Sequence, residues 1–205
     1  MAKSIRLVIP DSGVLISFAE SDLLDLLTVF HPHVDLVITD VVEYEVTHRI
    51  DIENAQRIRA FLSKNEGRIQ VDTTSFASQL KLIREGAKFD LPNDAGEMSI
   101  YSYVNTTRKS NPGEATLILF EDDWFIENAV RPGNVHLLST RAFLDGLEAL
   151  EPKFSSAAAL REILKRRPTV QAAKVDEVAS KVADGSEWAT AVNVAAAAKV
   201  GRRLR

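Results

Sequence analysis

Four acidic residues could do chemistry in this chain, because each follows an apolar segment or lies on the apolar side of an expected helix. They are Asp11, Glu45, Glu97 and Asp122. A carboxylate in apolar surroundings is poorly solvated and costly unless a partner binds it. Carboxylate oxygens are ligands that hard divalent cations take in proteins. The four acids therefore predict a site for Mg²⁺ or Mn²⁺ and, with such an ion, metal-assisted hydrolysis.

Two of these acids are expected at the ends of strands. Asp11 follows the apolar segment 5–9, and Asp122 follows the apolar residues 117–120. Ligands in open parallel sheets bind outside the carboxyl ends of strands, where acids from two strands can meet. Each acid has a plainer alternative as a turn residue, since Asp11-Ser-Gly is good turn chemistry. If the acids repel one another without a cation, Asp11→Asn should leave the fold intact or more stable.

Glu45 is expected on a helix that starts after Thr39. It follows Val41 by four positions and Val42 by three, so it shares their apolar face. Glu43 points roughly the other way and is expected on the solvated side. An inward glutamate has a structural explanation if an arginine pairs with it, and a functional one if it binds a cation.

Glu97 is expected at the start of another helix, over residues 95–106. Asp94 and Glu97 have the spacing of a capping box. Glu97 also stands one turn before Ile100 and Tyr101, which places it on the inward side. Both roles can hold together, so Asp94 and Glu97 are both candidate metal ligands. Gly96 beside them would let a substrate approach the backbone closely.

The composition narrows the classes of protein. With 205 residues, 45% hydrophobic and 26% charged, the chain can bury a core. It contains no cysteine, which excludes disulfides, thiolate zinc sites and cysteine nucleophiles. We therefore expect a cytoplasmic protein. The first apolar run is too short for a signal peptide, and no segment is long enough to span a membrane.

The charge is distributed unevenly along the chain. Residues 1–150 hold 14 Lys and Arg against 23 Asp and Glu, a balance of −9, whereas residues 151–205 hold 11 against 6, a balance of +5. We therefore expect an acidic domain over 1–150 and a basic, helical C-terminal extension over 151–205. A basic tail is compatible with nucleic-acid contact.

The alternation of apolar runs and amphipathic stretches predicts an α/β fold with a parallel sheet. Strands are expected at 5–9, 34–38, 69–71, 115–120 and 135–138. Helices are expected at 21–30, 41–49, 51–64, 76–85, 95–106, 123–130 and 141–150.

The extension shows no strand pattern and has too few apolar residues for a core of its own. Helices are expected from Ser155 to the basic residues 165–167, at 170–182 and at 187–200. These helices must pack on the body or on a second chain, with Trp188 as the anchor. We expect an oligomer interface, such as a homodimer, ahead of an RNA-contacting arm. The basic residues 165–167 either contact RNA or complement the helix dipole.

The order of the motifs resembles a PIN-domain nuclease, closest to bacterial VapC-type toxins. The resemblance covers residues 4–148. Its motifs are Asp11-Ser-Gly-Val-Leu-Ile, Ile38-Thr-Asp-Val-Val-Glu-Tyr-Glu45, Asp94-Ala-Gly-Glu97 and Leu119-Phe-Glu-Asp122. It implies a three-layer α/β/α domain with a mainly parallel sheet. It also implies a metal-dependent endoribonuclease with Asp11, Glu45, Glu97 and Asp122 as catalytic acids, RNA as substrate and, for a toxin, an antitoxin partner.

The chain departs from the family pattern at two positions. Gly13 stands where the family often has a hydroxyl or amide side chain, and Phe120 stands where a small hydroxyl residue often precedes the last acid. Thr140 is expected to supply a hydroxyl instead. The chief alternative is a non-catalytic PIN-fold module that binds a protein or RNA partner. A receiver-like domain also collects acids at strand ends, but it is disfavoured because Ser139, Thr140 and Arg141, and no lysine, follow the last strand.

Overall fold

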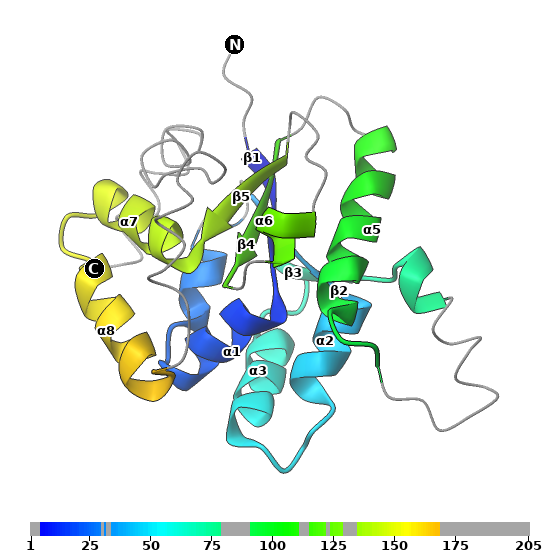
Figure 1. Ribbon diagram of the computed structural model, residues 1–205. Helices are drawn as coiled ribbons and strands as arrows, with labels where there is room; N and C mark the ends of the chain where they lie inside the picture. The colour runs from blue at the N-terminus through cyan, green and yellow to red at the C-terminus, as the bar shows by residue number, and fades with distance from the viewer. Residues whose placement is uncertain are drawn as a thin grey trace.

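The protein forms an α/β fold around one parallel sheet, as the alternation of segments predicts (Figure 1). The computed structural model describes residues 5–29, 31, 34–78, 91–110, 115–121, 124–128 and 135–168. The strands are β1 (Ile5–Pro10), β2 (Asp35–Thr39), β3 (Ile69–Asp72), β4 (Ala115–Phe120) and β5 (Val135–Ser139). The five expected strand segments are thus confirmed.

The strands lie in the order β3-β2-β1-β4-β5, and every neighbouring pair is parallel. The central strands are rich in branched apolar residues because helices cover them, and Ile9, Ile38 and Leu119 are all fully buried. The chain crosses from β3 to β4 on the far side of β1, so the strand order reverses beside β1. In parallel sheets, this point of reversal is where ligands bind.

Helices surround the sheet (Figure 1). They are α1 (Ser12–Glu20), the 3-10 helix η1 (Leu24–Thr28), α2 (Asp40–Thr47), α3 (Glu53–Lys64), α5 (Ala95–Ser110), α6 (Trp124–Asn128), α7 (Thr140–Leu150) and α8 (Ser156–Arg166). Helices α1, α2 and α3 pack on one another, and α5 packs on α2 and β2. Residues 75–78 are helical and overlap the start of the helix expected at 76–85, and residues 79–85 lie outside the described residues.

The register of the strands brings their carboxyl ends to one edge. Pro10 of β1 lies beside Leu119 of β4, and Phe120 lies beside Ser139 of β5. The amide of Asp11 donates to the Leu119 carbonyl at 2.9 Å. The residues that follow β1, β4 and β5 are therefore neighbours in space although the sequence separates them widely.

The segment after β1 does not form the turn that was the plainer alternative for Asp11. Asp11-Ser-Gly is not a turn but the start of α1, because the Asp11 carboxylate accepts the Val14 amide and caps the helix. The expected helix over 21–30 is wrong in type. Ser21 ends α1, Asp22 has a left-handed backbone (φ 57°), and a short 3-10 helix follows. The leucines of this 3-10 helix are buried. The apolar spacing that predicted an α-helix therefore reflects packing into the core.

The beginning of the C-terminal extension packs against the rest of the protein. Helix α8 contacts α7 and α1, with Ile163 fully buried. Ser155 caps α8 as predicted. The helices expected at 170–182 and 187–200, and Trp188, lie outside the described residues, so the division at residue 150 and the homodimer stay predictions. Within the described ranges, no helix has the length and hydropathy that a membrane crossing requires.

Candidate functional site

Glu45 lies where α2, the start of α1 and the start of α5 meet. Its carboxylate accepts hydrogen bonds from the Ser12 hydroxyl and from the Gly96 amide, the latter at 2.9 Å. The side chain is half-buried, on the helix face that Val41 and Val42 bury. The predicted inward orientation of Glu45 is therefore confirmed, and neutral groups from two distant segments hold it.

Burial raises the pKa of the Glu45 carboxyl above its ordinary value of 4.5. The bonds from Ser12 and Gly96 and the nearby His48 act against that rise, while the negative charge of Asp94 adds to it. Burial is the largest cause, so the ionised carboxylate is under-compensated where it stands. A cation bound beside it would relieve that cost.

Gly96 allows α5 to approach Glu45 so closely. A Cβ at position 96 would collide with the carboxylate of Glu45 and lie 3.2 Å from its Cδ and from Ser12 Oγ. The approach is fixed by buried hydroxyls, since Ser99 Oγ donates to the Gly96 carbonyl at 2.6 Å and lies 2.6 Å from Thr39 Oγ1. Thr39 also caps α2, so the helix that carries Glu45 and the helix that carries Gly96 share one anchor.

Asp11 is fully buried at the end of β1. One carboxylate oxygen accepts the Val14 amide at 2.7 Å, and the other accepts the Glu121 amide at 3.0 Å. Asp11 therefore links the start of α1 to the end of β4, and Ser12 next to it links the same junction to Glu45.

Glu121, which follows β4 directly, is a buried acid that the sequence analysis did not select. It is 6% exposed, and its oxygens accept from Ser17 Oγ at 2.7 Å and from Thr140 Oγ1 at 3.1 Å. Arg167 pairs with it at 3.1 Å. The hydroxyl expected from Thr140 is present at this edge, where it donates to Glu121. Glu121 thus has a cationic partner, whereas the hydrogen bonds that Glu45 accepts within the described residues come from neutral groups.

The other predicted acids either lie nearer the surface than Asp11 or fall outside the described residues. Asp94 is exposed and has a left-handed backbone (φ 61°), whereas a capping residue is usually extended. Its carbonyl accepts the Met98 amide at 2.9 Å. Glu97 is half-buried in the first turn of α5. Asp122 lies outside the described residues. Among the residues that the structure describes, no three His, Asp or Glu side chains are grouped closely enough to hold a metal.

An aromatic stack lies one turn along α2 from Glu45. The rings of Tyr44 and His48 are nearly parallel, with an angle of 11° and centroids 4.9 Å apart. His48 Nδ1 lies 3.0 Å from the Tyr44 carbonyl oxygen and 3.1 Å from that of Glu45, so its ring is held in place. His48 is exposed, so part of this aromatic stack faces solvent on the helix that carries Glu45.

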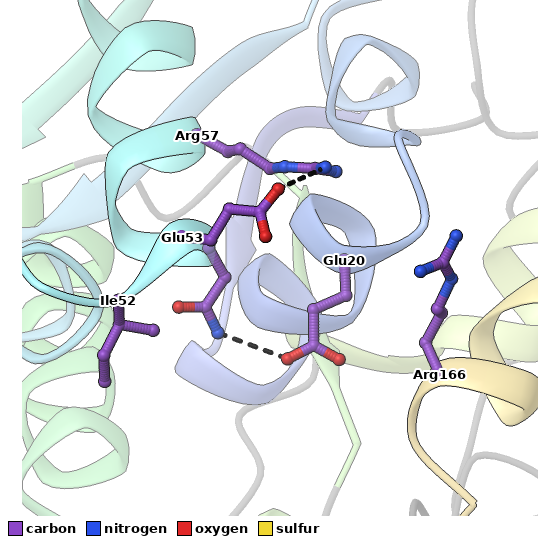
Figure 2. A pocket seen from close by; sticks show the side chains of 6 residues that line it. Glu20, Ile52, Glu53, Arg57 and Arg166 are labelled. Carbon is purple, nitrogen blue, oxygen red and sulfur yellow. Dashed lines mark hydrogen bonds and ion pairs between the residues drawn. The ribbon is translucent and has the colours of Figure 1, made fainter.

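A separate hollow of about 270 Å³ lies between α1, α3 and the end of α8 (Figure 2). Its lining includes Glu20, Glu53, Arg57 and Arg166 but neither Asp11 nor Glu45. Arg57 donates to Glu53 at 2.7 Å, and Asn54 donates to Glu20 at 3.2 Å. This hollow is lined by charges that largely pair with one another, and the chemistry predicted from the acids lies elsewhere.

The structure thus brings Asp11 and Glu45 to one junction and adds three residues that the sequence analysis missed. Glu121 had a usable signal, because it follows an apolar strand as directly as Asp11 does. Ser12 and Arg167 had none, since Ser12 looked like a turn residue and Arg167 like one charge among three. Comparison of the chain with protein-family models and with curated protein sequences returned no match.

Proposed function

We propose that the protein is a metal-dependent endoribonuclease with a three-layer, PIN-like domain, and that it hydrolyses RNA phosphodiester bonds. The parallel sheet with carboxylates past its strand ends and the motif order given above support this proposal. A toxin role with an antitoxin partner is a further possibility that the resemblance raises. The proposal does not depend on that role.

One observation carries the proposal: among the residues that the structure describes, the hydrogen-bond donors to the half-buried Glu45 carboxylate are the neutral Ser12 hydroxyl and Gly96 amide, and burial raises its pKa. A structural glutamate in that position would be expected to have an arginine partner, as Glu121 does. The missing side chain of Gly96 makes room for the Glu45 carboxylate against the backbone of α5. This arrangement suits a small cation bound at the Glu45 carboxylate.

The residues present fit Mg²⁺ or Mn²⁺ in part. Glu45 and Asp11, with Asp94 and Glu97 at the start of α5, are oxygen donors of the kind these ions take, whereas Glu121 is engaged with Arg167. We assign Asp122 to the set on sequence alone. A bound ion would supply positive charge to activate a water molecule and to stabilise the leaving oxygen.

The chain's own residues would perform the remaining tasks. Ser12 orients the Glu45 carboxylate, and the Val14 and Glu121 amides orient that of Asp11. We assign to Glu45 the acceptance of a proton from water, because Ser12 and Gly96 hold its carboxylate in a fixed orientation. A base of single-stranded RNA can stack on the exposed His48 ring, as bases do on aromatic platforms.

The test is cleavage of single-stranded RNA by the full chain with millimolar Mn²⁺. We expect cleavage that a chelator abolishes, and a melting temperature that Mn²⁺ raises. Glu45→Gln should lower kcat/KM by roughly 100-fold or more, the loss typical of a removed proton-transfer group. His48→Ala should raise KM and leave kcat nearly unchanged.

Glu43→Gln is the matched control, because Glu43 lies two positions away on the same helix and accepts from Thr47 instead. It should change cleavage by less than about twofold, as expected of a surface substitution. Equal losses in both variants, or no cleavage of RNA under any of these conditions, would contradict the nuclease. A melting shift with Mn²⁺ but no cleavage would favour the non-catalytic binding module.

A further inference from the structure

Arg167 reaches from the C-terminal extension into the junction that holds Asp11. Its Nη1 atom lies 2.9 Å from the Gly13 carbonyl oxygen, 2.6 Å from Ser17 Oγ and 3.1 Å from a carboxylate oxygen of Glu121. These three acceptors belong to the first turns of α1 and to the end of β4. One nitrogen therefore ties together two segments that lie more than 100 residues apart in the sequence.

Helix α8 is built to hold Arg167 in that place. Its start is capped by Ser155 and tied to α7 by the Ser156 hydroxyl, which donates to Glu148 at 2.6 Å. Ile163 fixes its middle in the core, and the Arg167 amide donates to the Ile163 carbonyl at 2.8 Å. The arginine side chain is 27% exposed. It is the predicted basic cluster's last member, and it points inward.

Two of the contacts of Arg167 involve residues that carry or adjoin the two amides that orient Asp11. Glu121 supplies one of these amides itself, and Gly13 directly precedes Val14, which supplies the other. The segments also touch directly, because a Cβ on Gly13 would lie 3.2 Å from Glu121 Cβ. A movement of Glu121 or of the Gly13 carbonyl would therefore be transmitted to the Asp11 carboxylate.

We propose that Arg167 is a positioning residue: by holding Glu121 and the Gly13 carbonyl, it fixes the orientation of the Asp11 carboxylate. The C-terminal extension would then help to orient an acid of the site, although the acids themselves belong to residues 1–150. The consequence for catalysis rests on the proposed function. The positioning of Asp11 does not, and it can be measured without RNA or metal.

The test is amide hydrogen exchange in the full-length protein, followed by NMR at Val14 and Glu121. The amide of Ile38 in the buried strand β2 reports general stability. Arg167→Met should speed exchange at Val14 and Glu121 about tenfold or more relative to Ile38, because local opening no longer breaks the arginine contacts. Arg166→Met, the same change at the exposed neighbouring residue, should leave this ratio within about twofold.

Arg167→Lys should restore slow exchange to within about threefold, because a single nitrogen makes all three contacts and an ammonium carries three donors. If Arg167→Met does not fold, the double variant Arg167→Met/Glu121→Gln removes both charges and so avoids an uncompensated buried carboxylate. Its two reporter amides should still exchange faster than in wild type, since the bonds to Gly13 and Ser17 are lost.

Equal acceleration at all three amides would make Arg167 a general stabiliser and overturn the proposal. Unchanged exchange at Val14 and Glu121, in the single or the double variant, would overturn it as well. A wild-type protein that cleaves no RNA would contradict the proposed nuclease alone, because the exchange result stands without it.

Discussion

Two glutamates at the same edge of the sheet have opposite electrostatic surroundings. Glu121 is almost completely buried, yet an arginine and two hydroxyls satisfy its carboxylate. Glu45 is less buried, yet its hydrogen-bond donors are a hydroxyl and an amide, and its pKa is raised. The degree of burial of a carboxylate therefore does not determine whether a positive side chain pairs with it.

The two glutamates differ in the source of the positive charge near their carboxylates. At Glu121 the protein provides it from α8, and the carboxylate serves to hold β4, α1 and α8 together. Within the described residues, His48 is the positive group that lowers the pKa of Glu45, and its effect is smaller than that of burial. A buried carboxylate without its own cation destabilises the fold and gains from one that binds. We infer that the buried Glu45 carboxylate lowers the stability of the metal-free protein and favours the binding of a cation.

The largest effect on stability is expected at Asp11, which connects the two corners. In Asp11→Asn, an amide group must replace one carboxylate oxygen, so an NH₂ group will face either the Val14 or the Glu121 amide. Urea unfolding should show a loss of about 1–3 kcal/mol, the cost of a buried donor left without an acceptor. This reverses the expectation, drawn from charge repulsion, that the variant would be at least as stable as wild type.

Asp25→Asn is a suitable control for that change. Asp25 pairs with Lys64 on the surface, where both side chains are about two-thirds exposed. The variant should lose no more than about 1 kcal/mol. If Asp11→Asn is as mild as Asp25→Asn, the charge-repulsion argument was correct, and the two amide bonds contribute little.

A smaller loss is expected from Gly96→Ala, which fills the space beside Glu45. The new methyl group would meet the carboxylate and lie 3.2 Å from Ser12 Oγ. Overpacking costs about 1–3 kcal/mol, and the better helix propensity of alanine offsets about 1 kcal/mol of that. Thermal unfolding should therefore show a net loss of about 1 kcal/mol. In a Glu45→Ala background the same change should be neutral or stabilising, because the carboxylate is gone.

A neutral Gly96→Ala in the otherwise unchanged protein would contradict this arrangement. It would mean that Glu45 does not lie against α5. The contrast between the surroundings of Glu45 and those of Glu121 would then not hold.

The smallest effect is a gain in stability that depends on pH. Because the folded pKa of Glu45 is raised above 4.5, the folded state binds the proton more tightly than the unfolded chain does. Stability from this group is present at low pH and falls as the pH rises above 4.5. Glu45→Gln cannot ionise, so without metal it should be more stable than wild type at pH 7, and the difference should vanish below about pH 4.5.

Glu43→Gln provides the comparison, since Glu43 lies on the same helix and its carboxylate accepts from Thr47. Melting temperatures of the three proteins between pH 4 and pH 8 measure the effect. A Glu45→Gln variant that is less stable than wild type at pH 7 would show that the carboxylate is well compensated. The Glu45 corner would then resemble the Glu121 corner.

The sequence by itself determined the class of fold and the orientation of Glu45. The strands could be located because uninterrupted apolar segments are needed wherever helices cover both faces of a sheet. Glu45 could be placed because its spacing from Val41 and Val42 depends only on the geometry of one helix. Both inferences rest on local periodicity, which a single segment carries.

The tertiary structure decided the roles of Asp11, Glu121 and Arg167. Asp11-Ser-Gly suits a turn or a helix start equally well, and the choice depended on the amides that the fold brings to its carboxylate. Arg167 looked like the basic end of a helix, because nothing in its neighbourhood of the sequence indicates an acid 46 residues away. Whether a buried charge has a partner is a property of contacts between distant segments. Periodicity within one segment cannot reveal it.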